Sequence, residues 1–325
     1  MNVVVTGGTG FLGRHMVVAL LEKGCNVTIL ARSPEKIDIV EHPNLSIWKG
    51  DITEPDSLTG LTDKVDVVYH FAAQIGEWNL PDDLFYSVNV KGTQNLMDEC
   101  LKNPGCRFIY ISTPGVQGKG HKRATEELPY NPPYIYEKTK CEAEKLVVSY
   151  HKSHGLPMGI VRPDFVYGPG DYRRISLYRT ILQKKFLIIG DGKAILHPTY
   201  VDDVTQGLLL LGEHQTAVND IFNIAGPEQL SVEDYVRIMA KVMGVPTHRF
   251  KIPLVIGKIA AGLCEKMSNV SGRPPFVSYS KIEFLTHDHG TDISKAEIIL
   301  NYSPKYDFTS GFRLTYDWAK NNNLI

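Results

Sequence analysis

The chain has 325 residues, of which 43% are apolar, enough for one large α/β unit and a smaller second domain. Its formal net charge of −1, from 35 basic and 36 acidic side chains without a long single-sign run, argues against nucleic acid or an anionic membrane surface as partner. Three observations predict a metal-free cytoplasmic protein with reduced thiols and no signal peptide. The five cysteines lack metal-binding spacing, the apolar stretches are too short to cross a bilayer, and the chain starts directly in a strand-like run.

The first half of the chain alternates short apolar runs with helix-like segments. The apolar runs predict strands at Asn2–Val5, Asn26–Leu30, Leu45–Trp48, Val65–Phe71, Arg107–Ser112 and Pro157–Arg162. The segments between them predict helices at Gly10–Lys23, Asp83–Lys102 and Tyr136–His154. Because the strands are nearly continuous in apolar residues, we expect helices on both sheet faces. The pattern predicts the α/β class, with a doubly wound parallel Rossmann sheet.

After Gly168-Pro169-Gly170 this alternation weakens, and Gly and Pro separate shorter elements. We therefore predict a dinucleotide-binding domain at residues 1–168 and a smaller α+β domain, mainly for substrate binding, at residues 169–325. A helix at Val201–Leu211 is expected to return to the first domain.

Three glycines stand between the first strand and the first helix. Gly7 permits a tight turn, Gly10 lets the backbone approach a pyrophosphate, and Gly13 permits close packing of helix on strand. The start of the helix offers free N–H groups and a partial positive charge to the phosphates. This loop predicts a dinucleotide site.

The end of the second strand bears on the choice of cofactor. An acidic residue there binds the ribose 2′-hydroxyl of NAD, whereas an arginine accommodates the 2′-phosphate of NADP. The strand ends in Arg32-Ser33, with a guanidinium able to pair with phosphate and a hydroxyl beside it. The sequence therefore favours NADP(H) over NAD(H), while an ordinary solvated arginine is the alternative.

Tyr136 and Lys140 are four residues apart and share one face of a predicted helix. The Lys140 ammonium is expected to stabilise a tyrosinate and so lower the pKa of Tyr136 for proton transfer. Ser112 and Thr113, at the end of the preceding strand, offer hydroxyls for a substrate oxygen. The spacing alone leaves Tyr134, with Lys138, as an alternative to Tyr136.

Ordered motifs along nearly the whole chain resemble the extended short-chain dehydrogenase/reductases of the epimerase/dehydratase type. The matching segments are TGGTGFLG at 6–13, GDI at 50–52, HFAA at 70–73, NVKGT at 89–93, YEKTK at 136–140, RPDFVYGPGD at 162–171, YVDD at 200–203 and FNIAGPEQLSVEDY at 222–235. The resemblance implies that Tyr136 is the acid/base, with Thr113 as the hydroxyl partner and Ser112 as its fallback. Lys140 then holds the nicotinamide ribose.

The resemblance also implies a set of cofactor-binding residues. Asp51 is implied for the adenine amino group, and Asn89 is implied as a structural asparagine. The complete predicted set is Gly7, Gly10, Phe11, Leu12, Arg32, Ser33, Asp51, Ile52, Ala72, Ala73, Asn89, Tyr136, Lys140, Pro163 and Val166.

Departures from the family pattern narrow the expected chemistry. Pro114-Gly115 follow Thr113 where 4,6-dehydratases of the family have an Asp-Glu pair, so dehydration is not expected. Leu196 stands where many nucleotide-sugar epimerases have a phosphate-binding arginine. His197 is either a substrate-facing or a packed residue, and three arginines are available for a phosphate or are merely solvated: Arg173, Arg174 and Arg179.

The sequence thus predicts an NADP-dependent oxidoreductase acting on a secondary alcohol or ketone. The alternatives are a UDP-sugar 4-epimerase with tightly bound NAD and a non-catalytic dinucleotide sensor. The family resemblance implies a homodimer through the predicted helices Asp83–Lys102 and Tyr136–His154. Surplus apolar positions on these helices agree with it: Leu84, Phe85, Val88, Leu96 and Met97, and Cys141, Leu146, Val147 and Tyr150.

Overall fold

A computed structural model describes residues 1–36, 41–76, 79–214, 219–246, 251–272, 274–275 and 277–325. Its centre is a sheet of seven parallel strands: β1 (Asn2–Thr6), β2 (Asn26–Ala31), β3 (Leu45–Lys49), β4 (Val67–His70), β5 (Arg107–Ile111), β7 (Met158–Pro163) and β12 (Asp220–Ile224). Their order in the sheet is β12-β7-β5-β4-β1-β2-β3. The predicted fold class is confirmed.

Six of these strands are those predicted from the apolar runs, with ends shifted by one or two residues. The strand β12 was not predicted, because Asp220 and Asn223 interrupt its apolar run. It pairs with β7 at the edge of the sheet, with Asp220 opposite Gly159. The Rossmann sheet therefore takes a strand, as well as the predicted helix, from the second half of the chain.

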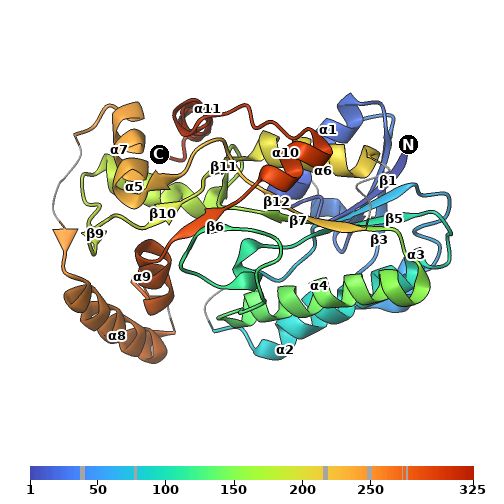
Figure 1. The fold of residues 1–325 in the computed structure, drawn as a ribbon, viewed down its shortest axis with the longest axis horizontal. Coiled ribbons are helices and arrows are strands. Elements are labelled where there is room, and N and C mark those ends of the chain that lie inside the picture. The colour runs from blue at the N-terminus through green and yellow to red at the C-terminus, as the bar shows by residue number, and fades with distance from the viewer. Residues whose placement is uncertain (37–40, 77–78, 215–218, 247–250, 273, 276) are drawn as a thin grey trace.

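Helices cover both faces of the sheet (Figure 1). On one face lie α1 (Phe11–Glu22), α6 (Val201–Glu213) and α10 (Ser294–Leu300), which share a core with β1, β2 and β12. On the other lie α2 (Asp82–Phe85), α3 (Thr93–Cys100) and α4 (Ile135–His154), with a second core. Both faces are buried, as the continuous apolar strands predicted.

The predicted helix Asp83–Lys102 is not one regular helix. Between α2 and α3 the segment Tyr86–Gly92 has the wider turns of a π-helix, a rare form often found at functional sites. The backbone runs close to Ile52 here, since a Cβ on Gly92 would lie 2.7 Å from the Ile52 side chain. The Thr93 hydroxyl donates to the Asn89 carbonyl at 2.6 Å.

Most of the apolar side chains that we expected to be available to a partner subunit are buried within the chain itself. Phe85, Leu96, Met97, Cys141, Val147 and Tyr150 are all buried. The sequence pattern overestimated the free apolar surface, because one face of these helices packs on the sheet and the neighbouring face packs between α3 and α4. Tyr86 is the large apolar residue of this region that is exposed.

The second half builds a third core beside the sheet, around Tyr178, Tyr235 and Phe312. Its helices are α5 (Ile175–Leu182), α7 (Val232–Val242), α8 (Leu254–Ser271), α9 (Tyr279–Thr286) and α11 (Phe308–Asn321). Short strand pairs lie outside the central sheet: β6 (His121–Ala124), from the first half of the chain, with β15 (His289–Thr291), β8 (Val166–Tyr167) with β11 (Thr199–Tyr200), β9 (Ile188–Ile189) with β14 (Lys251–Ile252), and β10 (Ile195–Leu196) with β13 (Leu230–Ser231). Short 3₁₀ turns lie at Pro34–Lys36, Pro55–Leu58, Pro114–Gln117 and Tyr172–Arg174. Within the described ranges, no helix combines the length and apolar character that crossing a membrane requires.

Candidate active site

A cavity of about 930 Å³ lies at the carboxyl ends of the strands. The sheet order reverses at β1, and in open α/β sheets ligands bind at such a switch point. With the exception of Asn89, every predicted site residue lines this cavity: Gly7, Gly10, Phe11, Leu12, Arg32, Ser33, Asp51, Ile52, Ala72, Ala73, Thr113, Tyr136, Lys140, Pro163 and Val166. Tertiary structure thus brings together residues from seven separate stretches of sequence.

The glycine loop has the geometry that a pyrophosphate requires. Gly7 has φ +67°, and a Cβ there would lie 2.7 Å from the Ala72 nitrogen. A Cβ on Gly13 would lie 2.2 Å from the Gly7 carbonyl oxygen, so only glycine permits this approach of α1 to the loop. At Gly10, which itself lines the cavity, a Cβ would meet only the Gly7 oxygen, at 3.2 Å.

The start of α1 lines the same cavity. Its N-cap residue, Gly10, provides no side chain to accept hydrogen bonds from the first turn, and that turn contains no acidic residue. The free N–H groups and the positive end of the helix dipole are therefore available to an anion. The residues present fit a bound dinucleotide.

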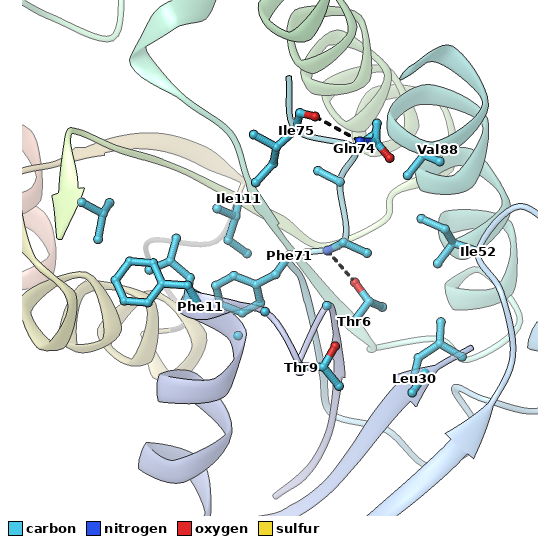
Figure 2. Close-up of a pocket in the computed structure, with 18 of the residues that line it drawn as sticks. Thr6, Thr9, Phe11, Leu30, Ile52, Phe71, Gln74, Ile75, Val88 and Ile111 are labelled. Carbon is cyan, nitrogen blue, oxygen red and sulfur yellow. Dashed lines mark hydrogen bonds between the residues drawn. The ribbon is translucent and has the colours of Figure 1, made fainter. Parts of the chain in front are cut away.

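The far end of the cavity is formed by Arg32, Asp51 and Ile52. The Arg32 side chain is 77% exposed, and its Nη1 lies 3.9 Å from Oδ2 of Asp51. Oδ1 of Asp51 accepts hydrogen bonds from the backbone and hydroxyl of Thr53, both at 2.9 Å, which fixes the carboxylate. Figure 2 shows Leu30, Ile52 and Val88 grouped on this side of the cavity, away from Phe11.

Asn89 is 1% exposed and does not line the cavity. Its amide accepts a hydrogen bond from the Gln74 nitrogen at 2.7 Å and donates to the Gln74 carbonyl at 3.1 Å and to the Thr139 hydroxyl at 2.9 Å. It thus ties the loop after β4 to α4. This geometry suits the structural role implied for Asn89.

His70, at the end of β4, is fully buried in a chain of hydrogen bonds. Its Nδ1 bonds the Thr6 hydroxyl at 2.7 Å and its Nε2 bonds the Thr93 hydroxyl at 2.9 Å. The Thr6 hydroxyl also accepts from the Ala72 nitrogen at 3.2 Å (Figure 2). Burial lowers the pKa of His70 to about 3, so the ring is neutral and serves to fix the loop beside the glycine turn.

Tyr136 and Lys140, both from α4, line the cavity on its inner side. Nζ of Lys140 donates to the Ile111 carbonyl at 2.6 Å, and burial lowers the pKa of Lys140 to about 7. Burial, reinforced by the neighbouring Glu137, raises the pKa of Tyr136 to about 12, with Arg173 acting in the opposite direction. This differs from the expected lowering by Lys140, because the ammonium is turned toward Ile111 and is itself desolvated.

The structure separates the two candidate hydroxyls after β5. Ser112 is buried and donates to Oε2 of Glu144 at 2.5 Å, within a buried ion pair of Glu144 with Arg162. Both residues line the cavity, but Thr113 accepts only a local hydrogen bond, from the Gly115 nitrogen at 3.2 Å. The Thr113 hydroxyl is therefore the one of the two that is left to bond a group held in the cavity.

A second cavity of about 570 Å³ adjoins the first, and the two share Thr113, Pro163 and Arg174. Its wall is rich in apolar and aromatic side chains: Phe165, Leu177, Phe186, Leu196, Tyr235, Val236, Phe284 and Leu285. Phe165 and Phe284 are stacked, with ring centroids 5.2 Å apart. We expect this cavity to take the body of the substrate.

The arginines proposed for a phosphate divide into three cases. Arg174 donates to Asp171 and to the Val166 carbonyl, both at 2.9 Å, so its guanidinium is engaged. Arg179 donates to the carbonyl of Leu324, near the carboxy terminus. Arg173 also donates to Asp171, at 3.3 Å, but its side chain is largely exposed and lines the first cavity.

His197 is buried and faces neither cavity. Its Nε2 bonds the Gly226 carbonyl at 2.9 Å, its Nδ1 accepts from the Thr291 nitrogen at 3.4 Å, and burial lowers its pKa. Of the two alternatives for this residue, the packed one is correct.

Sequence reasoning missed several residues that line the first cavity, among them Thr9, Gln74, Val88 and Tyr172. Gln74 directly follows the HFAA segment and was within reach of the motif argument. The second cavity carried no sequence signal, because its walls come from β6, α5, α7 and α9, which are far apart in the chain.

A family model described as the NAD dependent epimerase/dehydratase family matches residues 3–225. Among curated proteins, the 3 beta-hydroxysteroid dehydrogenase/Delta 5→4-isomerase of Mycobacterium tuberculosis is 29% identical over 324 residues, covering 94% of this chain and 86% of the relative. The decarboxylating sterol-4-alpha-carboxylate 3-dehydrogenase of Schizosaccharomyces pombe is 28% identical over 336 residues, covering 98% and 97%.

Among solved structures, the UDP-glucuronic acid 4-epimerase of Bacillus cereus in complex with NAD is similar over 99% of both chains, with 27% identity and a TM-score of 0.80. The similarity thus extends through the sheet and the second half of the chain alike.

Proposed function

The chain belongs to the NAD-dependent epimerase/dehydratase family, and from this premise we propose that it reduces a ketone, or oxidises the corresponding secondary alcohol, on a largely apolar small molecule. One observation carries the proposal: Thr113 stands on the wall between a cavity that fits a dinucleotide and a cavity lined mainly by apolar side chains. A steroid-like ketone matches this wall, and two of the similar proteins are named as steroid or sterol dehydrogenases.

In this reaction the dinucleotide supplies or accepts the hydride. Thr113 donates a hydrogen bond to the substrate oxygen, and Tyr136 transfers the proton. A phenol with a pKa of about 12 holds its proton at neutral pH, so Tyr136 is suited to donate to the alkoxide that forms as a ketone is reduced. Lys140 anchors α4 on the Ile111 carbonyl, and Asn89 bonds Thr139 of the same helix, so both hold the helix that carries Tyr136.

For the cofactor we propose NADP(H). The exposed guanidinium of Arg32 at the far end of the cavity supports a 2′-phosphate, whereas its neighbour Asp51 and the NAD bound to the Bacillus cereus epimerase support NAD(H). The ratio of the two dissociation constants, measured by isothermal titration, decides between them.

A UDP-sugar 4-epimerase is the second candidate, supported by the similarity to the Bacillus cereus structure. Two observations count against it. Leu196, at the position where many nucleotide-sugar epimerases have a phosphate-binding arginine, is buried in the wall of the second cavity, and the guanidinium of Arg174 is already paired with Asp171. The apolar wall therefore favours the ketone.

A homodimer and a cytoplasmic location stay predictions, and sedimentation at micromolar concentration tests the homodimer.

The proposal is tested with the purified full chain, NADPH and NADH, a 3-ketosteroid, UDP-glucose and UDP-glucuronic acid. Cofactor absorbance follows net reduction, and chromatography of the sugar nucleotides detects epimerisation, which leaves the absorbance unchanged. We expect oxidation of NADPH with the steroid ketone. Epimerised sugar without cofactor oxidation would establish the second candidate instead, and bound dinucleotide without any turnover would indicate a sensor.

A further inference from the structure

The side chain of Glu137 lies against Gly115, two residues after Thr113, although no acidic residue directly follows Thr113 in the sequence. Glu137 belongs to the first turn of α4, and its side chain packs beneath Gly115. A Cβ on Gly115 would lie 2.8 Å from Cγ and 3.7 Å from Cδ of Glu137, and 3.5 Å from Oγ1 of Thr113. The absence of a side chain at position 115 therefore makes the room that the Glu137 carboxyl fills.

Glu137 lines the second cavity, on the substrate side of the site, whereas its neighbour Tyr136 lines the first. Consecutive residues of a helix point about 100° apart. The two side chains therefore border different cavities, and these cavities share Thr113.

One oxygen of the Glu137 carboxyl, Oε2, is buried without a hydrogen-bond partner among the described residues. The acidic groups around it are engaged: Glu283 pairs with Lys119 and Tyr134, and Asp164 accepts from the Thr291 hydroxyl. A buried unpaired carboxyl oxygen is unfavourable and calls for a ligand or a catalytic role. Burial raises the pKa of Glu137, although the backbone amides of Glu137 and Tyr134 oppose the rise.

We propose that Glu137 is a second acid/base group of this enzyme, which exchanges a proton with the carbon next to the substrate carbonyl. The inference rests on the proposed function, since it requires a ketone bound beside Thr113. It adds an enolisation activity to the hydride transfer.

The step balances without an oxidant or reductant. The Glu137 carboxylate takes a proton from the α-carbon, the C–H electron pair becomes the C=C bond of an enolate, and the carbonyl π electrons move to oxygen. Hydrogen bonds from Tyr136 and Thr113 stabilise the oxyanion. The protonated Glu137 then returns its proton to the α-carbon or, in a β,γ-unsaturated ketone, to the γ-carbon, which shifts the double bond.

A structural role alone is the competing explanation, because a glutamate in the first turn of a helix also stabilises its amino terminus. The variant Glu137→Gln keeps a side chain that accepts hydrogen bonds at this place but cannot act as a base. Glu142→Gln is a matched control, because Glu142 is an exposed carboxylate on the same helix.

The experiment incubates the full chain with NADP⁺ and 17β-hydroxy-5α-androstan-3-one in deuterium oxide. Mass spectrometry follows deuterium uptake next to the ketone, and NADPH oxidation with the same steroid gives the hydride-transfer rate. We expect Glu137→Gln to slow deuterium uptake about 100-fold or more, and hydride transfer less than about tenfold. Glu142→Gln should match the wild type in both rates, and thermal unfolding checks that each variant is folded.

Equal deuterium uptake by the wild type and Glu137→Gln, or hydride transfer without deuterium uptake by the wild type, would overturn the role of Glu137. The absence of NADPH oxidation by the wild type has a different meaning. It would refute the steroid-like ketone of the proposed function, and the inference with it.

Discussion

Nζ of Lys140 donates a hydrogen bond to the carbonyl oxygen of Ile111 at 2.6 Å, at the carboxyl end of β5. The ammonium also lies 4.0 Å from the centre of the Tyr110 ring. The side chain is thus buried against a strand end while its helix position keeps it in the cavity wall beside Tyr136. A positive charge in this position is costly, and its protonation is coupled to folding.

Burial lowers the pKa of Lys140 to about 7, with Glu144 acting in the opposite direction, whereas the unfolded chain has the ordinary value of about 10.4. Between these values the unfolded state binds more protons, so the stability of the wild type rises with pH. Relative to Lys140→Met, the free energy of unfolding should increase by about 2 kcal/mol from pH 7 to pH 9. Urea titrations of both proteins measure this difference in the free energy of unfolding. A difference that did not change with pH would contradict the lowered pKa of Lys140.

Loss of the Thr113 hydroxyl should mainly lower kcat, whereas loss of the Ser112 hydroxyl should mainly lower the stability of the fold. Thr113→Ala is expected to lower kcat about 100-fold, because a hydrogen bond to the forming alkoxide is lost, with little change in stability. Ser112→Ala should reduce stability by about 1–3 kcal/mol, because the buried Glu144 carboxylate loses a donor. Steady-state kinetics and chemical denaturation separate the two effects. A larger kcat loss in Ser112→Ala would reverse their roles.

Alanine at Gly10 and at Gly13 should produce different defects. A Cβ at Gly13 would lie 2.2 Å from the Gly7 oxygen, so Gly13→Ala should destabilise the protein by at least about 2 kcal/mol. At Gly10 the backbone has φ −78°, which alanine adopts readily. Gly10→Ala should therefore fold normally and bind the dinucleotide at least about tenfold more weakly. Calorimetry measures both quantities, and normal cofactor binding by Gly10→Ala would refute the pyrophosphate site.

Arg32→Ala should weaken NADPH binding about tenfold or more, because a charge-assisted hydrogen bond to the 2′-phosphate is lost. Binding of NADH should change by less than about threefold, since NADH has no such phosphate. Arg14→Ala is a suitable control, because Arg14 is an exposed arginine of α1 outside the cavity. Isothermal titration gives both constants. An equal loss of affinity for both cofactors would argue against recognition of the 2′-phosphate by Arg32.

Asp164, which lines the second cavity, should make stability fall with rising pH, the opposite of the effect expected for Lys140. Burial raises the pKa of Asp164 to about 7, above the unfolded value of about 3.9, although the Thr291 hydroxyl opposes the rise. The unfolded state therefore loses its proton first, and the stability contributed by this group falls as pH rises from 4 to 7. Asp164→Asn should exceed the wild type in stability at pH 7.5 by up to about 4 kcal/mol. Thermal unfolding from pH 4 to 7.5 tests whether the difference grows with pH.

The sequence determined the sheet and the cofactor end of the site. Continuous apolar strands, the Gly7–Gly13 turn and the Tyr136–Lys140 spacing depend on local geometry, which one stretch of chain encodes by itself. The ends and the regularity of the predicted helices were less accurate. The π-type turns at Tyr86–Gly92, for example, depend on the close approach of Gly92 to Ile52, which is a contact between distant segments. The edge strand β12 likewise forms only because β7 is beside it.

Only the tertiary structure decided the second cavity, which is the proposed substrate side. The apolar wall of the second cavity is assembled from elements spread over more than half of the chain, so no short motif marks it. The sequence indicated only that Pro114 and Gly115 stand where 4,6-dehydratases of the family have an Asp-Glu pair after the threonine. Packing brings the side chain of Glu137 from α4 against Gly115. Sequence motifs record neighbours along the chain, whereas the groups around a substrate are neighbours only after long-range packing of helices on the sheet.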